Sequence, residues 1–387
     1  MIYSMSVKII HICQDEKFIN SAIQQFEFSF PDSNTFYVVS HLPNFVHVKY
    51  QECVQHCNIL HLKTIAHTLD KSALVVLHSL PVAFYDFVLQ LPKENTVIWL
   101  CFGFEIYNDP NFFKTKNLLD TITKNRFPEV KTIKKKKVKD LVRPYYRLLN
   151  KKLPLSSREF KIKVLKRINF LGSSFQEEFE SICLLLKQKK VFFDFWYYPL
   201  EQILDVSAPR NLDKKNILIG NSGSTSGNHL DVFDQLKKYN LTAEKIIVPL
   251  NYGESKYIDV VVNEGNNHFA QKFTPLLEFL SLQEYNVILD GVGIAILNNR
   301  RQQAVGNTIA LLWMGAKVFL SKHNPFYHFL MRKGLNIYCY EIDLNEQNCN
   351  QLLSLQQIEH NRSVLFNLLN REKLAVELQE QILKINA

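Results

Sequence analysis

The stretch Asn216-Ile217-Leu218-Ile219-Gly220-Asn221-Ser222-Gly223-Ser224-Thr225-Ser226-Gly227-Asn228-His229 changes abruptly from an apolar run to a run of glycine and small polar residues. Continuous apolar runs of this kind are typical of parallel strands that are covered on both faces. Residues 229–238 then carry apolar residues at helical spacing. We therefore expect a strand at Ile217–Gly220, a tight loop and a helix, which is the repeating unit of an α/β fold.

The same alternation continues on the C-terminal side of this stretch. Further strands are expected at Lys245–Pro249, Val287–Leu289, Lys317–Leu320 and Leu335–Tyr340. Near the C-terminus, apolar residues recur on one side of a helix, at Leu365, Leu368, Leu369, Leu374, Leu378 and Ile382. This pattern predicts one long amphipathic helix at the end of the chain.

The N-terminal half shows the same rhythm. Near-continuous apolar runs predict strands at Val7–Ile12, Thr35–Ser40, Ala73–Leu77, Thr96–Phe102, Ile168–Leu171 and Val191–Tyr198. Residues 199–215 combine prolines with mixed charge and little periodicity, which indicates a linker. We therefore expect an α/β fold of two Rossmann-like domains, residues 1–205 and 206–387, that face a cleft, with the C-terminal helix packing back.

The composition places the chain among folded proteins of a reducing compartment. It has 387 residues, 47% of them apolar and 21% charged, and its seven cysteines include no CxxC pair, which argues against a disulfide framework. Cys53, His56 and Cys57 lack a second ligand cluster, so no metal site and no cofactor are expected. With neither a signal-peptide pattern nor an 18-residue apolar run, the sequence predicts a cytoplasmic location.

A basic insertion interrupts the N-terminal half. Residues 114–167 contain 19 Lys or Arg and four acids, and the whole chain has a net charge of +9. The densest part carries Lys134, Lys135, Lys136, Lys137, Arg143, Tyr145, Tyr146 and Arg147. Cations interleaved with aromatic and aliphatic residues favour an interfacial helix on an anionic membrane surface. A solvated surface segment is the alternative. A nucleic-acid partner is not expected, because no nucleic-acid motif accompanies the charge.

The glycine-rich stretch quoted first has the residue types that hold phosphate groups. Glycines such as Gly223 let the backbone approach a ligand closely, and hydroxyl and amide side chains can bind it or cap the next helix. We take Asn221, Ser222, Gly223, Asn228 and His229 as candidate ligand contacts. The spacing fits neither a Walker A loop nor the dinucleotide fingerprint. A βα loop without any binding role would use the same residue types.

A second polar run lies at Asn298-Asn299-Arg300-Arg301-Gln302-Gln303-Ala304-Val305-Gly306-Asn307-Thr308. It follows a strand-like run at 293–297 and opens an apolar helix over 308–314. Free N–H groups at the start of a helix, with two guanidinium groups one turn before it, suit a pyrophosphate. The candidate contacts are Arg300, Arg301, Gln302, Gln303, Gly306 and Asn307. Pro249 and Tyr252, at the end of the expected strand Lys245–Pro249, are candidate contacts for the base and sugar of a nucleotide.

The candidates for a catalytic base lie at strand ends in the N-terminal half. Glu105 follows an apolar strand beside Gly103, where burial can raise the pKa of a carboxyl group and a general base is easily placed. His78 ends another strand, and Asp15 lies in the first βα turn. A solvated loop glutamate, a structural histidine and a helix-capping aspartate are the respective alternatives. No Asp-x-Asp loop indicates a metal-bridged diphosphate, and no Gly-x-Ser-x-Gly elbow indicates a hydrolase.

Five short segments, in the same order, resemble one enzyme family. Ile217-Leu218-Ile219-Gly220-Asn221-Ser222 resembles the ILxGNS segment of the TDP-N-acetylfucosamine:lipid II N-acetylfucosaminyltransferases, glycosyltransferase family 56. The other matches are Gly103-Phe104-Glu105-Ile106-Tyr107, Val248-Pro249 with Tyr252, Arg301-Gln302-Gln303 with Gly306, and Asn324-Pro325-Phe326. The resemblance is strongest over residues 216–340 and thin before residue 95.

The resemblance implies a GT-B glycosyltransferase with an N-terminal acceptor domain and a C-terminal nucleotide-sugar domain. It further implies inverting, metal-independent transfer of a deoxy-amino sugar from a TDP-sugar to an undecaprenyl-pyrophosphate-linked glycan. The expected location is then the inner face of the cell membrane, as in the synthesis of enterobacterial common antigen. The Ser- and Gly-rich loop and the long basic insertion depart from the family pattern, which leaves the exact sugar open.

Two other classes of function remain open on the sequence alone. A non-catalytic protein that binds anionic lipid or nucleic acid on a duplicated α/β scaffold would bind polyanions in a salt-dependent way and would not bind TDP. A sugar-nucleotide epimerase of related architecture would need neither a lipid nor a basic, aromatic insertion.

Overall fold

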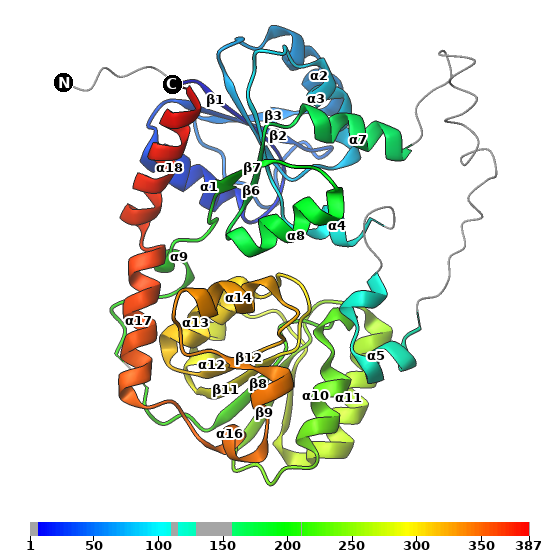
Figure 1. The fold of residues 1–387 in the computed structure, drawn as a ribbon, viewed down its shortest axis with the longest axis vertical. Helices are drawn as coiled ribbons and strands as arrows, with labels where there is room; N and C mark the ends of the chain where they lie inside the picture. Colours follow the sequence, from blue (N-terminus) through cyan, green and yellow to red (C-terminus); the bar gives the residue numbers. More distant parts are fainter. Residues whose placement is uncertain (1–6, 110–114, 129–156, 210, 387) are drawn as a thin grey trace. The chain divides into compact units, whose positions relative to one another are not determined.

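A computed structural model describes residues 7–109, 115–128, 157–209 and 211–386 (Figure 1). Contacts between residues divide the chain into two compact units. Of the described residues, unit 1 comprises 7–109, 157–197 and 375–386, and unit 2 comprises 115–128, 198–209 and 211–374. The two parallel α/β sheets that the sequence predicts are confirmed.

Unit 1 is built on a seven-stranded parallel sheet in the order β3-β2-β1-β4-β5-β6-β7. The strands are β1 (Ile9–Gln14), β2 (Asn34–Val39), β3 (Val54–Cys57), β4 (Leu74–His78), β5 (Val97–Leu100), β6 (Phe170–Ser173) and β7 (Val191–Asp194). The central strands β1, β4 and β5 are buried almost completely, because helices cover both faces of the sheet.

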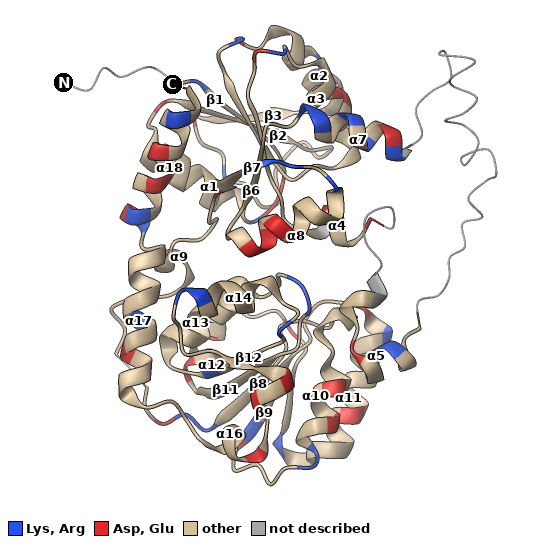
Figure 2. Cartoon of the chain, in the orientation of Figure 1, with Lys and Arg blue, Asp and Glu red and all other residues tan. Residues whose placement is uncertain are grey.

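Two hydrophobic cores flank this sheet. One face packs against α2 (Ile59–Thr68), α3 (Tyr85–Gln90), α7 (Ser157–Arg167) and α8 (Gln176–Leu186). The other face packs against α1 (Ile19–Ser29) and the C-terminal helix α18 (Arg371–Asn386), which buries Leu378 and Ile382 there. In Figure 2, α7 is coloured mainly for Lys and Arg, and the coloured part of α8 is mainly Asp and Glu. The short helix α4 (Phe104–Tyr107) follows β5.

Unit 2 contains a six-stranded parallel sheet in the order β10-β9-β8-β11-β12-β13. Its strands are β8 (Asn216–Ile219), β9 (Lys245–Pro249), β10 (Phe273–Leu276), β11 (Val292–Leu297), β12 (Lys317–Leu320) and β13 (Tyr338–Cys339). A single core joins one face of this sheet to α10 (His229–Leu236) and α11 (Ser255–Phe269). Helix α13 (Val305–Met314) packs against α12 (Leu282–Asp290) and α17 (Leu355–Leu369).

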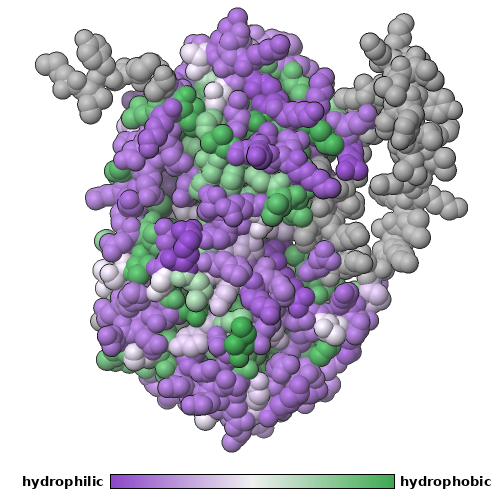
Figure 3. Space-filling model, viewed as in Figure 1, coloured by the Kyte–Doolittle hydropathy of each residue, from purple (hydrophilic) through white to green (hydrophobic). Residues whose placement is uncertain are grey.

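The remaining helices of unit 2 are short. They are α5 (Thr121–Arg126), α9 (Leu200–Ile203), α14 (Pro325–Arg332), α15 (Tyr340–Asp343) and α16 (Glu346–Asn350), with a 3₁₀ turn at Thr115–Leu118. The face shown in the space-filling view is mostly hydrophilic, with scattered apolar patches on both units (Figure 3). Within the described ranges, no helix is both long and apolar enough to cross a bilayer.

Several predicted elements need correction. Val287–Leu289 belongs to α12, and the strand in this region is β11, because the nine-residue helix from Leu282 carries the apolar run to Asp290. The single C-terminal helix is two helices, α17 and α18, because Asn370 adopts an extended conformation between them. Strands β3 and β10 were not predicted. The contact division also differs from a split at residue 205, since residues 115–128 join unit 2 and α18 joins unit 1.

Candidate active site

A polar pocket of about 470 Å³ opens at the carboxyl edge of the unit 2 sheet. It is lined by Asn221, Ser222, Ser224, Tyr252, Gly253, Glu254, Arg301, Gln303, Ala304, Gly306 and Asn307. These residues come from the loops that follow β8, β9 and β11, three neighbouring strands of the sheet. Ligands of open parallel sheets bind at this edge, so the pocket lies where the fold favours a ligand.

Two glycines bring the first two loops together. Gly223 donates its N–H to the carbonyl of Tyr252 (2.7 Å) and accepts the N–H of Glu254 (2.9 Å), which forms a bridge between Gly223 and Gly253. Gly253 has a φ of +139°, and a Cβ there would lie 2.2 Å from the backbone of Gly223. The close approach of these backbones therefore requires glycine, and it fixes one wall of the pocket.

The N-terminus of α13 forms the opposite wall. Ala304 precedes the helix in the left-handed conformation (φ 58°), and its side chain does not cap it. A Cβ on Gly306 would meet no atom within 4 Å, so this turn of the helix borders open space. The first N–H groups of a helix have no partner within it and carry partial positive charge, which makes this wall suited to an anion.

Side-chain amides connect the walls. Gln303 donates Nε2–H to Asn221 Oδ1 (3.1 Å), and Ser226 donates its hydroxyl to Gln303 Oε1 (3.1 Å). Asn307 donates Nδ2–H to the Tyr285 hydroxyl of α12 (3.2 Å). Arg301 supplies a guanidinium group at the rim. The pocket thus combines oriented amides, hydroxyl groups and a cation, which suit a phosphate-bearing ligand.

In unit 1, Glu105 lies on α4 just beyond the carboxyl end of β5 and is only 8% exposed. Its Oε1 accepts the backbone N–H of Leu80 (3.2 Å) and the indole N–H of Trp99 (3.3 Å). Burial raises the pKa of this carboxyl group, and the two N–H donors offset only part of that shift. A carboxyl group with a raised pKa has the proton affinity that a general base needs.

His78 lies at the end of β4 inside a buried chain of hydrogen bonds. Asn34 Oδ1 can only accept, so His11 Nε2–H donates to it (3.2 Å), which leaves His11 Nδ1 to accept from His78 Nε2–H (3.0 Å). His78 Nδ1 then accepts the Tyr197 hydroxyl (2.8 Å).

Burial lowers the pKa of His11 to about 3 and that of His78 well below its usual value. Both rings are therefore neutral at physiological pH. The Asn34 amide fixes the tautomers of both histidine rings. Its Nδ2–H donates to Glu27 Oε1 (2.8 Å), so its Oδ1 is the atom that faces His11. The chain stops at an amide that does not accept a proton readily, so it positions Tyr197 rather than conducting protons.

Asp15 follows β1 and organises a loop. Its carboxylate accepts the backbone N–H groups of Val46 (2.5 Å), His47 (3.0 Å) and Val48 (2.8 Å). Burial acts to raise the pKa of Asp15, but these three donors outweigh it and lower the pKa. An aspartate held in this way is a weak base, and among the three predicted candidates only Glu105 has a raised carboxyl pKa.

The sequence profile of the 4-alpha-L-fucosyltransferases, glycosyl transferase group 56, matches residues 179–380, which is just over half of the chain. The chain belongs to this fucosyltransferase family. The family resemblance predicted from the sequence is confirmed, and the protein is a glycosyltransferase.

Solved structures support the fold of this glycosyltransferase. A trehalose 6-phosphate synthase from Burkholderia multivorans is 8% identical, with a TM-score of 0.63 over 98% of this chain and 96% of that one. E. coli trehalose-6-phosphate synthase bound with UDP-2-fluoro glucose is 9% identical (TM-score 0.61; 98% and 99% covered). A glycosyltransferase from Rickettsia africae is 12% identical (TM-score 0.60; 98% and 97% covered). These likenesses confirm the predicted GT-B fold.

The pocket of this fucosyltransferase-family protein brings together most, but not all, of the residues predicted to bind the donor. Asn221, Ser222, Tyr252, Arg301, Gln303, Gly306 and Asn307 line it, and Gly223 supports its wall. Asn228, His229, Pro249, Arg300 and Gln302 are not among its lining residues. Ser224, Gly253, Glu254 and Ala304 line it without having been predicted, although the first stood in the glycine-rich stretch.

Two of the predicted donor residues instead hold the segment 115–128 on unit 2. Asn228 Oδ1 accepts the backbone N–H of Asp120 (2.8 Å), and Asn228 Nδ2–H donates to the carbonyl of Leu118 (3.0 Å). Arg300 forms an ion pair with the Asp120 carboxylate (2.6 Å). Asp231 accepts the N–H groups of Ile122 (2.7 Å) and Thr123 (3.0 Å). This network explains why the segment belongs to unit 2.

His229 has a structural environment as well. Its backbone N–H and its Nδ1 both lie within hydrogen-bond distance of the Tyr257 hydroxyl (2.9 and 3.1 Å). Its ring fills the space beside Gly220, where a Cβ would lie 2.2 Å from His229 Nε2. Burial lowers the pKa of His229 to about 4, so the ring is neutral at physiological pH.

The predicted membrane contacts Lys134, Lys135, Lys136, Lys137, Arg143, Tyr145, Tyr146 and Arg147 lie outside the described residues. They stay a prediction from the sequence.

Proposed function

We propose that this glycosyltransferase moves a deoxy-amino sugar of the 4-acetamido-4,6-dideoxygalactose type from a TDP-sugar to a lipid-linked glycan in surface polysaccharide synthesis. The observation that carries the proposal is the amide-rich pocket at the start of α13, in a chain of the 4-alpha-L-fucosyltransferase family. The E. coli structure of the same fold bound with UDP-2-fluoro glucose supports a nucleotide-sugar donor.

The pyrophosphate of the donor would lie against the N-terminus of α13. The backbone N–H groups of Gly306 and Asn307 and the guanidinium group of Arg301 border the same pocket. These groups favour the negative charge that grows on departing TDP, and preorganised donors of this kind commonly contribute a factor of about 10² to 10³ each. Transfer would be a single in-line displacement that inverts the anomeric carbon.

The nucleobase would lie near Tyr252 at the rim of the pocket. The rings of Tyr252 and Phe279 are nearly parallel, 12° apart in orientation with centroids 6.3 Å apart, and both are exposed. Exposed, parallel aromatic faces are surfaces on which a pyrimidine can stack. This arrangement supports a nucleotide at this end of the pocket.

Glu105 would take the proton of the acceptor hydroxyl, as its raised pKa supports. For the acceptor we propose an undecaprenyl-pyrophosphate-linked glycan, as the family resemblance implies. The basic, aromatic composition of residues 114–167 supports work on an anionic surface at the inner face of the cell membrane.

The two neighbouring arginines give a direct test, because Arg301 lines the pocket and Arg300 does not. Arg301→Ala is expected to weaken TDP binding about 10- to 100-fold, because a charged hydrogen bond to phosphate is lost. Arg300→Ala is expected to leave TDP affinity within about threefold, since Arg300 pairs with Asp120. Isothermal titration with TDP, and with UDP and GDP for comparison, measures both. A chain that binds none of the three nucleotides would contradict the proposed TDP-sugar donor.

Gly306→Ala should have effects of opposite sign on binding and on stability. The new methyl group meets no protein atom within 4 Å and projects into the open space that the diphosphate would use, so TDP affinity should fall about tenfold. Alanine favours a helix over glycine by up to about 1 kcal/mol, so the free energy of unfolding should rise slightly. Calorimetric titration and urea unfolding check the two halves. Unchanged TDP affinity would place the pyrophosphate elsewhere.

A further inference from the structure

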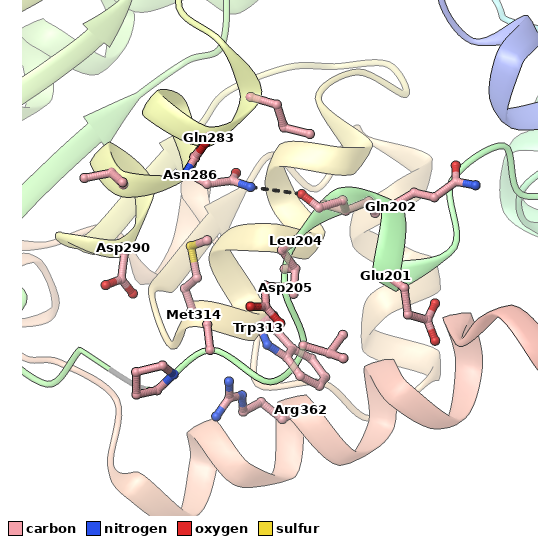
Figure 4. A pocket seen from close by; sticks show the side chains of 16 residues that line it. Glu201, Gln202, Leu204, Asp205, Gln283, Asn286, Asp290, Trp313, Met314 and Arg362 are labelled. Carbon is pink, nitrogen blue, oxygen red and sulfur yellow. Dashed lines mark hydrogen bonds between the residues drawn. The ribbon is translucent and has the colours of Figure 1, made fainter.

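Unit 2 contains a second, larger pocket of about 860 Å³, whose lining shares no residue with the donor pocket (Figure 4). Its walls come from residues 201–209, from α12, from the C-terminal end of α13 and from Arg362 of α17. The volume is within the range of about 300 to 1,000 Å³ that is usual for small-molecule sites. Neither the fold nor the proposed transfer reaction accounts for this pocket.

The position of the pocket in the chain suggests a regulatory role. The chain passes from unit 1 to unit 2 after Tyr197, and residues 201–209, which follow this crossing, contribute to the pocket. Glu201 on this segment accepts the backbone N–H of Arg371 (3.1 and 3.3 Å to its two oxygens), which lies shortly before the chain returns to unit 1 at Ala375. A molecule in the pocket would therefore contact the segment that follows the first crossing.

The walls of the pocket are mainly apolar. Leu204, Trp313 and Met314 line it, and Leu282 and Val287 of α12 project beside it with 59% and 72% of their surface exposed. Exposed apolar side chains at the mouth of a cavity are typical of sites that bind the apolar part of a ligand.

One buried polar group points to the other part of the ligand. Trp313 is only 7% exposed, yet its indole N–H has no hydrogen-bond partner among the described residues. Buried indole N–H groups usually have a partner, because leaving one unsatisfied costs about 1 to 3 kcal/mol. The Arg362 guanidinium lies over the face of the ring (4.7 Å to its centroid), which leaves the N–H at the edge for an acceptor.

The charged side chains that line the pocket already have partners. Asp205 accepts the N–H and the hydroxyl of Ser207 (2.9 and 2.6 Å), and Asp290 pairs with Lys214 (3.7 Å). A charged ligand would therefore gain little here, whereas an uncharged acceptor would satisfy the Trp313 N–H.

We propose that this pocket binds an uncharged amphiphile, with an aliphatic chain against Leu282, Val287 and Met314 and a carbonyl or hydroxyl oxygen that accepts the Trp313 N–H. The ligand contacts α12 and α13, and these helices also meet at the donor pocket, where Asn307 donates to Tyr285 (3.2 Å). Binding in the larger pocket therefore changes the affinity of the donor pocket for TDP, and by reciprocity TDP changes the affinity for the amphiphile.

The test is titration of the full chain with N-octanoyl-N-methylglucamine, an uncharged acyl amide, below its micelle concentration. Isothermal calorimetry should detect saturable binding, and the emission of Trp313, the one tryptophan of residues 198–374, should shift. Val287→Glu should weaken binding at least tenfold, because it places a charge on the apolar wall. Trp313→Phe should weaken it about fivefold, because it removes the N–H and keeps the ring.

Ile342→Glu is the matched control, since Ile342 is also 72% exposed but does not line the pocket. It should leave binding unchanged. Absence of saturable binding to the unmodified chain, or equal losses in the two glutamate variants, would overturn the proposal. The calorimetric titration with the amphiphile needs no TDP. It therefore tests the larger pocket independently of the proposed TDP-sugar donor. A TDP affinity that does not respond to a saturating amphiphile would overturn the coupling.

Discussion

Glu105→Gln is expected to lower the turnover of sugar transfer by about 10²- to 10⁴-fold, the usual contribution of a general base. Glutamine has nearly the same shape but cannot take a proton from the acceptor hydroxyl. Glu105 belongs to unit 1, whereas the proposed diphosphate groups belong to unit 2, so the affinity for TDP should stay within about twofold. Turnover is followed by mass spectrometry of the lipid-linked product, and TDP affinity by calorimetry.

The same substitution should not destabilise the fold. The amide oxygen of glutamine can still accept the N–H groups of Leu80 and Trp99, which the carboxylate accepts at 3.2 and 3.3 Å. Burial disfavours the charged form of Glu105, so a neutral side chain should leave the free energy of unfolding equal or slightly higher. Loss of activity together with loss of stability would indicate a structural role for Glu105.

The pH dependence of transfer gives a second readout of the same group. A general base acts in its ionised form, and the pKa of Glu105 is raised by burial. Activity should therefore fall on acidification at a higher pH than the usual glutamate value of 4.5 would predict. In Glu105→Gln this acidic limb should disappear from the residual rate.

Glu178→Gln is a suitable control, because Glu178 is also buried (1% exposed) in unit 1 and accepts the Ser173 hydroxyl (3.0 Å). It should keep most of the transfer activity. An inactive Glu178→Gln beside an active Glu105→Gln would move the catalytic role to Glu178.

The strands that the sequence predicts best are those buried on both faces. Such strands, β4 and β9 among them, read as continuous apolar runs, and β9 matches its predicted bounds. The strands that were not predicted lie at sheet edges. β3 has only four residues, of which the central two are exposed, and β10 contains Pro275, so neither gives a continuous apolar run. The helix α12 was taken for a strand because its short apolar run resembles one.

The site was predicted by segment more accurately than by residue. The sequence indicates the loops after β8 and β11, because glycine and polar residues are dense there, directly after strand-like apolar runs. It does not tell Arg300 from Arg301, because which of two adjacent side chains faces Asp120 depends on a tertiary contact 180 residues away in the chain. Asn228 likewise has the composition of a ligand contact, yet it binds the backbone of the segment 115–128.

The three buried histidines predict a strong loss of stability on mild acidification. Burial lowers the pKa of His11 to about 3, that of His229 to about 4 and that of His78 well below the unfolded value of 6.5. The unfolded chain therefore binds protons below pH 6.5 that the folded chain does not, so stability falls as the pH falls. At about pH 5.5 His11 and His229 should each cost about 1.4 kcal/mol, and His78 should add to this loss.

The loss should be unequal between the units. Unit 1 contains His11 and His78 and unit 2 contains His229, so acidification should destabilise unit 1 more than unit 2. Urea unfolding of the Trp313→Phe chain at about pH 7.5 and pH 5.5 measures this for unit 1, because the remaining tryptophans, Trp99 and Trp196, both belong to unit 1. Glu105, with its raised pKa, contributes in the opposite direction.

Glutamine variants assign the effect to individual rings. His78→Gln can still donate to His11 and accept from Tyr197 but does not titrate, so it should remove part of the acid sensitivity. His61→Gln, at an exposed position of α2, is the surface control and should leave it unchanged. An acid sensitivity that is the same in both variants would mean that the His78 ring reaches water and is protonated in the folded chain. The chain of hydrogen bonds from Asn34 to Tyr197 would then not be a closed part of the core.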